Sequence, residues 1–188
     1  MLKNTQQSYG VVSIGLHWLT AAAVFTLFPL GLWMVGLDYY DAWYHKAPDL
    51  HKSIGILLFM VIALRLCWRW LNPRPEPIGN ALEKRLAGLA HRVLYLLMLM
   101  LIASGYLIST AEGAPIDVFG WFKVPAILHG LEGQADIAGE IHELLAFTLI
   151  GLVAIHAAAA LKHHYIDRDR TLSRMLGAGS SGHRTDTN

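Results

Sequence analysis

Four long apolar stretches dominate this chain, and three of them contain no charged residue. The three charge-free stretches are 4–37, 93–111 and 144–161. Each is close to or longer than the ~20 residues that a helix needs to cross a bilayer. The fourth stretch is charge-free only over 53–64, so a helix that crosses here must also include Arg65. A long basic side chain near a helix end can reach the headgroups, and we therefore predict that this stretch spans as well.

These stretches predict an all-α integral membrane protein, an up-down-up-down four-helix bundle that forms one domain over 1–176. The helices are expected at about 11–37, 51–71, 92–111 and 140–165. The first stretch exceeds the apolar region of a signal peptide, and no small-residue cleavage site follows it, so it is predicted to be a retained helix. The end of the chain, 177–188, is rich in Gly, Ser and Thr and is predicted to be a disordered cytoplasmic tail.

Composition and charge add the surroundings and the orientation. Hydrophobic residues make up 54% of the chain and charged residues 15%, with mean hydropathy +0.40, which favours a lipid bilayer as partner and no nucleic acid. Of the 15 lysines and arginines, only Lys46, Lys52 and Lys123 lie in the connections after the first and third helices. Because positive residues concentrate in cytoplasmic loops, both termini are predicted to be cytoplasmic.

Four histidines lie inside or at the ends of the predicted helices. They are His17, His51, His142 and His156. Ionisable groups in a membrane are costly, so they indicate function by default. The last two are fourteen residues apart, which places them on one helix face with about 21 Å of rise between them. In an alternating bundle His17 then lies at the depth of His156, toward the cytoplasm, and His51 at the depth of His142, toward the outside.

Two facing imidazoles supply the axial ligands of a six-coordinate haem iron, and bundle cores commonly hold such cofactors. The depths therefore predict two haem b groups, with iron held by the pairs His17–His156 and His51–His142. Cys67 is the only cysteine, so the haem would be bound non-covalently. Structural zinc needs four ligands in one small site, which the separation along the fourth helix excludes. Each histidine, taken singly, can also be explained by a hydrogen bond to a neighbouring helix.

Four further residues are weaker candidates. His163 follows His156 by seven residues, about 10 Å along the helix, which is too far to bind the same iron. It can contact a haem propionate or a quinone carbonyl, or it is an ordinary histidine at a helix end. Arg65 and Arg69 share a helix face and suit a propionate or a reduced quinone, because the guanidinium binds oxygen pairs. Positive-inside placement also explains them. His91, at the start of the third helix, is a further candidate.

Several segments of this sequence together resemble the bacterial di-haem cytochrome b561 proteins. They are Ile14–Leu19, Leu50–Gly55, Ser104–Leu107 and His156–Tyr165, with Asp169 and Thr171 following. The resemblance covers almost the whole chain. It implies four transmembrane helices in a bacterial inner membrane, two b-type haems on the four histidines, and ubiquinone as a redox partner. It also makes His163 and the Arg65–Arg69 region candidate quinone contacts.

A member of that family oxidises superoxide and passes the electron to ubiquinone, so superoxide:ubiquinone oxidoreductase is the first hypothesis. The alternative is an electron-carrier cytochrome b subunit that relays electrons between quinone and a periplasmic redox protein. A histidine-lined metal or proton transporter without haem is the third. The predicted outer connections are mostly acidic, whereas a site for an anion should be positive. Only His45, Lys46 and Lys52 offer a positive approach near His51.

Overall fold

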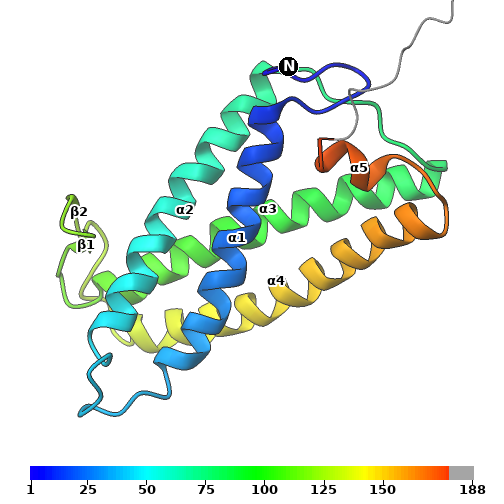
Figure 1. Cartoon of the computed structure of the whole chain (residues 1–188). Coiled ribbons are helices and arrows are strands. Elements are labelled where there is room, and N and C mark those ends of the chain that lie inside the picture. Colours follow the sequence, from blue (N-terminus) through cyan, green and yellow to red (C-terminus); the bar gives the residue numbers. More distant parts are fainter. Residues whose placement is uncertain (178–188) are drawn as a thin grey trace, which may run out of the picture.

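Four long helices make up most of the structure, a computed structural model in which residues 1–177 are described (Figure 1). They are α1 (Val11–Met34), α2 (Lys46–Leu71), α3 (Ala81–Thr110) and α4 (Gln134–Tyr165). Each is long and apolar enough to cross a membrane, and at most 28% of any apolar window is buried inside the protein. Apolar side chains therefore face outward along all four helices, as lipid contact requires. The predicted four-helix membrane bundle is confirmed. The predicted tail 177–188 lies outside the described residues, apart from Gly177.

The bundle consists of two antiparallel helix pairs. Helix α1 packs along α2, α3 packs along α4, and α2 and α3 have a smaller contact. Figure 1 shows consecutive helices running in opposite directions. The core at the centre of the bundle is entirely apolar. It consists of Val24, Leu58, Ile62, Leu94, Leu97, Met98, Leu145 and Leu149. All four helices contribute to it, so it ties the two pairs together.

Three helices begin earlier than the hydropathy pattern predicts, and α1 ends earlier, at Met34. Helix α3 shows the reason most clearly. The Asn80 side chain accepts hydrogen bonds from the backbone N–H groups of Leu82 and Glu83, and the Glu83 carboxylate accepts one from the Asn80 N–H. This capping box starts the helix eleven residues before the expected position. Hydropathy misses it because the first turns of α3 are polar and lie beyond the apolar stretch.

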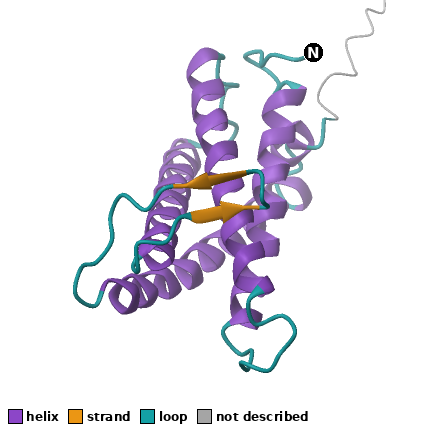
Figure 2. Ribbon diagram, turned by 90° about the vertical axis from the view of Figure 1, so that its left-hand side faces the viewer, coloured by secondary structure: helices purple, strands orange, loops and turns teal. Residues whose placement is uncertain are grey.

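The connection between α3 and α4 contains a short antiparallel hairpin, β1 (Ile116–Val118) and β2 (Phe122–Val124), which Figure 2 shows in orange. Ser53 of α2 fixes it in place. Its hydroxyl donates to the Asp117 carbonyl and accepts from the Phe119 N–H, both at 3.3 Å. The hairpin therefore lies beside the start of α2, and we call this side of the bundle the hairpin end.

The opposite side, the terminal end, carries the N-terminal segment and the short helix α5 (Thr171–Met175). Helix α5 is held to α1 by the indole of Trp18, which donates to the Met175 carbonyl at 2.8 Å. The indole of Trp68 donates to the Ser13 hydroxyl at 3.1 Å and joins α2 to the start of α1. Polar contacts thus tie the segments together at both ends of an apolar bundle.

Candidate functional site

Two layers of polar and small residues cross the bundle, one on each side of the apolar core. We call them the hairpin layer (Gly31, His51, Gly105 and His142) and the terminal layer (His17, Arg65, His91 and His156). Every helix contributes one residue to each layer, and in every helix the two are fourteen residues apart. Fourteen residues are close to four turns, so both residues of a helix face the same direction. The bundle therefore presents two stacked sites that face inward.

The structure brings together the histidines that were paired by depth. The ring centroids of His17 and His156 are 6.4 Å apart, and those of His51 and His142 are 6.2 Å apart. Imidazoles on opposite sides of one metal ion, each with a bond of about 2 Å, have centroids about 6 Å apart. Both separations fit this arrangement. The rings are too far apart for direct van der Waals stacking, and each pair leaves room for one ion between them.

The hydrogen bonds of His142 suit a metal ligand. Its Nδ1 lies 3.1 Å from the Leu101 carbonyl and 3.0 Å from the Ser104 hydroxyl. That hydroxyl donates its own proton to Leu101, so both partners accept from His142 and the ring proton must be on Nδ1. The lone pair is then on Nε2. Histidine ligands are typically oriented in this way by an acceptor behind the ring.

Two glycines let the rings of the hairpin layer lie against the neighbouring helices. A Cβ added to Gly105 would lie 3.2 Å from Cε1 of His142, and one added to Gly31 would lie 3.3 Å from Cε1 of His51. Both distances are tighter than ordinary van der Waals contact. Nδ1 of His51 is buried and has no hydrogen-bond partner in the described part of the chain. This ring is therefore positioned by its packing against Gly31, without a hydrogen bond to Nδ1.

Replacing Gly105 with alanine should push His142 out of position and weaken the binding of the predicted haem in the hairpin layer alone. Alanine is the better helix former, so α3 itself is not destabilised. Changes behind a ligating histidine typically cost 10–100-fold in metal affinity, and we expect a loss of about tenfold. Haem content and redox spectra of the purified variant measure it. Gly151→Ala is the matched control, because a Cβ there meets no atom within 4 Å; equal losses in both variants would contradict this role for Gly105.

The terminal layer has a different, cationic environment. Nη2 of Arg65 lies 2.9 Å from Nδ1 of His17. The guanidinium groups of Arg65 and Arg69 lie 5.4 Å and 5.7 Å from the ring centroid of Tyr95. Within residues 1–177 neither arginine forms an ion pair with a carboxylate. Cation–π contact with Tyr95 thus holds two uncompensated positive charges beside this layer.

His91 also belongs to the terminal layer, with its ring centroid 5.3 Å from that of His156. This separation is about 1 Å shorter than those of the depth-paired rings, too short for an ion bound between two opposed imidazoles. His91 therefore fits a neighbour of the site better than a ligand. The sequence pattern placed it only as a further candidate.

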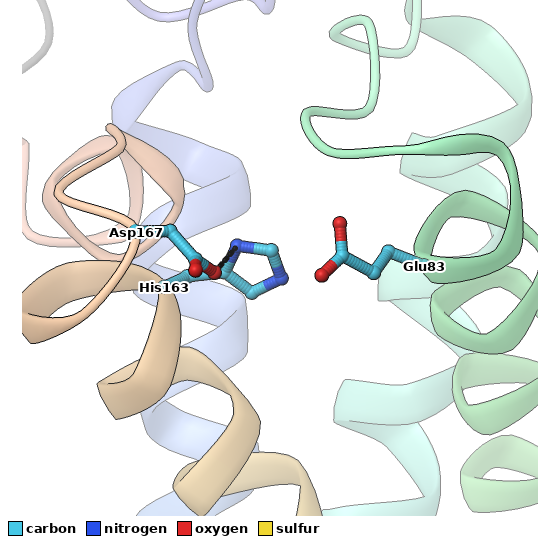
Figure 3. A group of neighbouring side chains, drawn as sticks. All are labelled: Glu83, His163 and Asp167. Carbon is cyan, nitrogen blue, oxygen red and sulfur yellow. Dashed lines mark ion pairs between the residues drawn. The ribbon is translucent and has the colours of Figure 1, made fainter.

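His163 lies outside both layers, in a polar cluster at the terminal end (Figure 3). Its Nδ1 is 2.6 Å from Asp169 and 3.2 Å from Asp167. Partial burial alone would raise the pKa of Asp169. Hydrogen bonds from the Thr171 side chain and backbone, and from His163, outweigh that effect and hold the pKa below its usual value. The Asp169 carboxylate is therefore charged at neutral pH, and it orients the His163 ring.

Ligand atoms of Glu83, His163 and Asp167 lie within 4.8 Å of one another, close enough to surround a metal ion. A cation already lies among these groups. The ammonium group of Lys162 is 2.8 Å from a Glu83 oxygen and 2.8 Å from an Asp167 oxygen. The cluster is therefore explained as an ion-pair network that joins the start of α3 to the end of α4.

A cavity of about 680 Å³ opens at the hairpin end, between the end of α1 and the start of α2. His45 and Lys52, two of the three residues expected to form a positive approach, line it. The charge of Lys52 is compensated by Asp49, 2.8 Å away. The third residue, Lys46, lies 5.9 Å from the ring centroid of Trp43. The approach is thus less positive than the sequence alone indicates.

Comparison with known proteins gives one family over nearly the whole chain. The family model described as prokaryotic cytochrome b561 matches residues 8–178. Cytochrome b561 homolog 2 of Escherichia coli strain K12 is 53% identical over 180 residues, which are 95% of this chain and 96% of that protein.

The names of two more distant relatives differ, and only the first of them states an activity. A probable superoxide oxidase CybB of Yersinia pestis is 30% identical over 174 residues, 90% of this chain and 96% of that protein. A cytochrome b562 of Cereibacter sphaeroides is 30% identical over 177 residues, 91% of this chain and 96% of that protein. The matches run nearly end to end, so both layers fall within the shared region.

Proposed function

The chain belongs to the prokaryotic cytochrome b561 family, and from that premise we propose that it is a superoxide:ubiquinone oxidoreductase with two haems. Membership makes it a haem b-binding membrane protein of electron transfer. The number of haems, their ligands and both substrates are the proposal. In the net reaction two superoxide ions are oxidised to two molecules of oxygen, and ubiquinone takes up two electrons and two protons to become ubiquinol.

The observation that carries this proposal is the pair of histidine layers. Ring separations of 6.4 Å and 6.2 Å suit one haem iron between His17 and His156 and another between His51 and His142. The haems, when bound, supply the one-electron chemistry. The protein's contribution is to hold them at two depths, and the apolar core between the layers excludes water from the path. Two layers at opposite ends of the bundle suit transfer across a membrane.

At the hairpin end, the cavity between the end of α1 and the start of α2 is the proposed entry for superoxide. His45, Asp49 and Lys52 line it. A small anion needs a positive group to approach in an otherwise acidic region, and the ammonium group of Lys52 is the proposed one. The ion pair between Lys52 and Asp49 holds the ammonium group at the cavity wall. We place this end on the outer side of the membrane, because the excess of lysine and arginine lies at the other end.

At the terminal end, His163 is the proposed contact for a quinone carbonyl. Asp169 accepts the Nδ1 proton of His163. Nε2 then accepts from the hydroxyl group of ubiquinol, and it donates to a quinone carbonyl when the ring carries a second proton. The carboxylates of Asp167 and Glu83 lie close to this ring, and both are groups that can carry protons. Arg69, which has no acidic partner among residues 1–177, is placed to bind a propionate or a reduced quinone, and Arg65 is the second candidate.

Stopped-flow spectroscopy of the purified holoprotein tests the proposal. Superoxide alone should reduce the haems rapidly, and added ubiquinone should reoxidise them with formation of ubiquinol. A reduced-minus-oxidised spectrum without two low-spin b-type components would refute the di-haem assignment. Slow reduction by superoxide, together with fast equilibration with ubiquinol, would instead favour the electron-carrier subunit with a periplasmic redox partner. The name of the more similar relative, cytochrome b561 homolog 2, states no substrate, so this carrier function is the second candidate.

A further inference from the structure

The two layers differ in what lies behind their ligands, and this difference has a redox consequence. In the hairpin layer, Nδ1 of His142 donates to two neutral acceptors, the Leu101 carbonyl and the Ser104 hydroxyl. In the terminal layer, Nδ1 of His17 is contacted by the guanidinium group of Arg65. A guanidinium has only donors, so His17 has a cation behind it where His142 has acceptors.

We propose that Arg65 gives the terminal layer a higher reduction potential than the hairpin layer, so that the protein itself directs electrons from the hairpin end to the terminal end. The inference rests on the proposed function, because it needs a haem in each layer. It concerns the order of the two reduction potentials and the resulting direction of electron transfer. Two stacked sites alone determine neither.

The first reason is ligand basicity. An acceptor behind a ligating imidazole makes the ring a stronger donor to the metal, and a stronger donor stabilises the ferric state. His142 has two such acceptors. A His17 that bound iron through Nε2 would carry its proton on Nδ1, and the group behind Nδ1 is the guanidinium of Arg65, which cannot accept that proton. Basicity therefore lowers the potential of the hairpin layer relative to that of the terminal layer.

The second reason is charge. Reduction adds one negative charge to a site, and a nearby cation stabilises that charge more strongly in a poorly hydrated interior than in water. Arg65 touches a ligand of the terminal layer, and Arg69 lies one turn further on, over the same Tyr95 ring. Neither arginine has a carboxylate partner within residues 1–177, so no acidic side chain of the described protein offsets their charge beside this layer. Charge and basicity thus favour the same order.

Spectroelectrochemistry on the full-length holoprotein measures both potentials. The wild type should show two one-electron components, and His156→Ala should retain the lower one, because only the hairpin layer remains intact. In Arg65→Met the equilibrium constant for reduction of the upper component should fall at least tenfold, which lowers its potential by 59 mV for one electron. Arg65→Lys should restore most of the shift. Ser104→Ala acts on the other layer and should raise the lower component.

Arg69→Met is the matched control, because it removes a positive charge over the same Tyr95 ring without touching His17. Its shift should be smaller than that of Arg65→Met. Equal shifts would overturn the role of the His17 contact, and retention of the higher component in His156→Ala would overturn the order. If Arg65→Met fails to bind haem, Ser104→Ala and the wild-type order still decide the proposal. Two components in reversed order would contradict this inference alone, whereas absence of two components would contradict the proposed function.

Discussion

Replacing His156 with alanine is expected to lower the haem content from the proposed two groups per chain to one and to abolish the proposed transfer of electrons to ubiquinone. The ring of His156 faces His17, with 6.4 Å between the ring centroids. A methyl group cannot bind iron, so the terminal layer would lose one of the two histidines proposed to hold its haem. The hairpin layer is about 21 Å away along α4 and keeps both rings. The pyridine haemochrome assay gives the haem content, and the reduced spectrum should retain one low-spin component.

His91→Ala is the matched control, because it removes a histidine from the same layer whose ring lies only 5.3 Å from that of His156. It should keep both haems. If His91→Ala loses a haem while His17→Ala does not, then His91 is the ligand opposite His156 and the pairing is wrong. Loss of both haems in His156→Ala would mean that the two layers do not bind independently.

The number of helices and the depth of the histidines could be predicted because both depend on distance along a helix. The fourteen residues between His142 and His156 fix their shared face, and alternating helix directions then pair each with a histidine of equal depth. The structure brings these rings together, as the pairing requires. Long apolar stretches likewise predict spanning helices whatever their neighbours are.

The rotation of each helix could not be predicted, because it depends on packing between helices. The rotation of each helix about its axis decides whether Arg65 contacts His17 and whether His91 lies beside His156. Gly31 follows His17 by fourteen residues, and Gly105 follows His91 by the same number. Glycine is common in membrane helices, so this spacing gains meaning only when the structure shows His51 packed on Gly31 and His142 packed on Gly105. The hairpin and the capping box of α3 lie in polar sequence, where hydropathy carries no information.

His163→Ala is expected to slow reduction of ubiquinone by about 100-fold while haem content and reduction by superoxide stay unchanged. The physical reason is the proton that a reduced quinone must gain, because a positioned histidine typically contributes 10²–10⁴-fold to such transfers. The ring is oriented by Asp169 at 2.6 Å and lies about 10 Å along α4 from His156. Loss of the His163 ring should therefore slow the reduction of ubiquinone without displacing His156, the proposed haem ligand. Stopped-flow reoxidation of the reduced protein by ubiquinone measures this step by itself.

His164→Ala provides the control. The ring of His164 packs on Tyr165 and, among the described residues, forms no ion pair with the acidic cluster around His163. This variant should reoxidise at the wild-type rate. Asp169→Asn should give an intermediate rate, since an amide can still accept from His163 but carries no charge to stabilise a protonated ring. Equal rates for His163→Ala and the wild type would place the quinone elsewhere. A parallel loss of haem would show instead that His163 supports the fold of the terminal end, because a group that acts only on the quinone leaves both spectra intact.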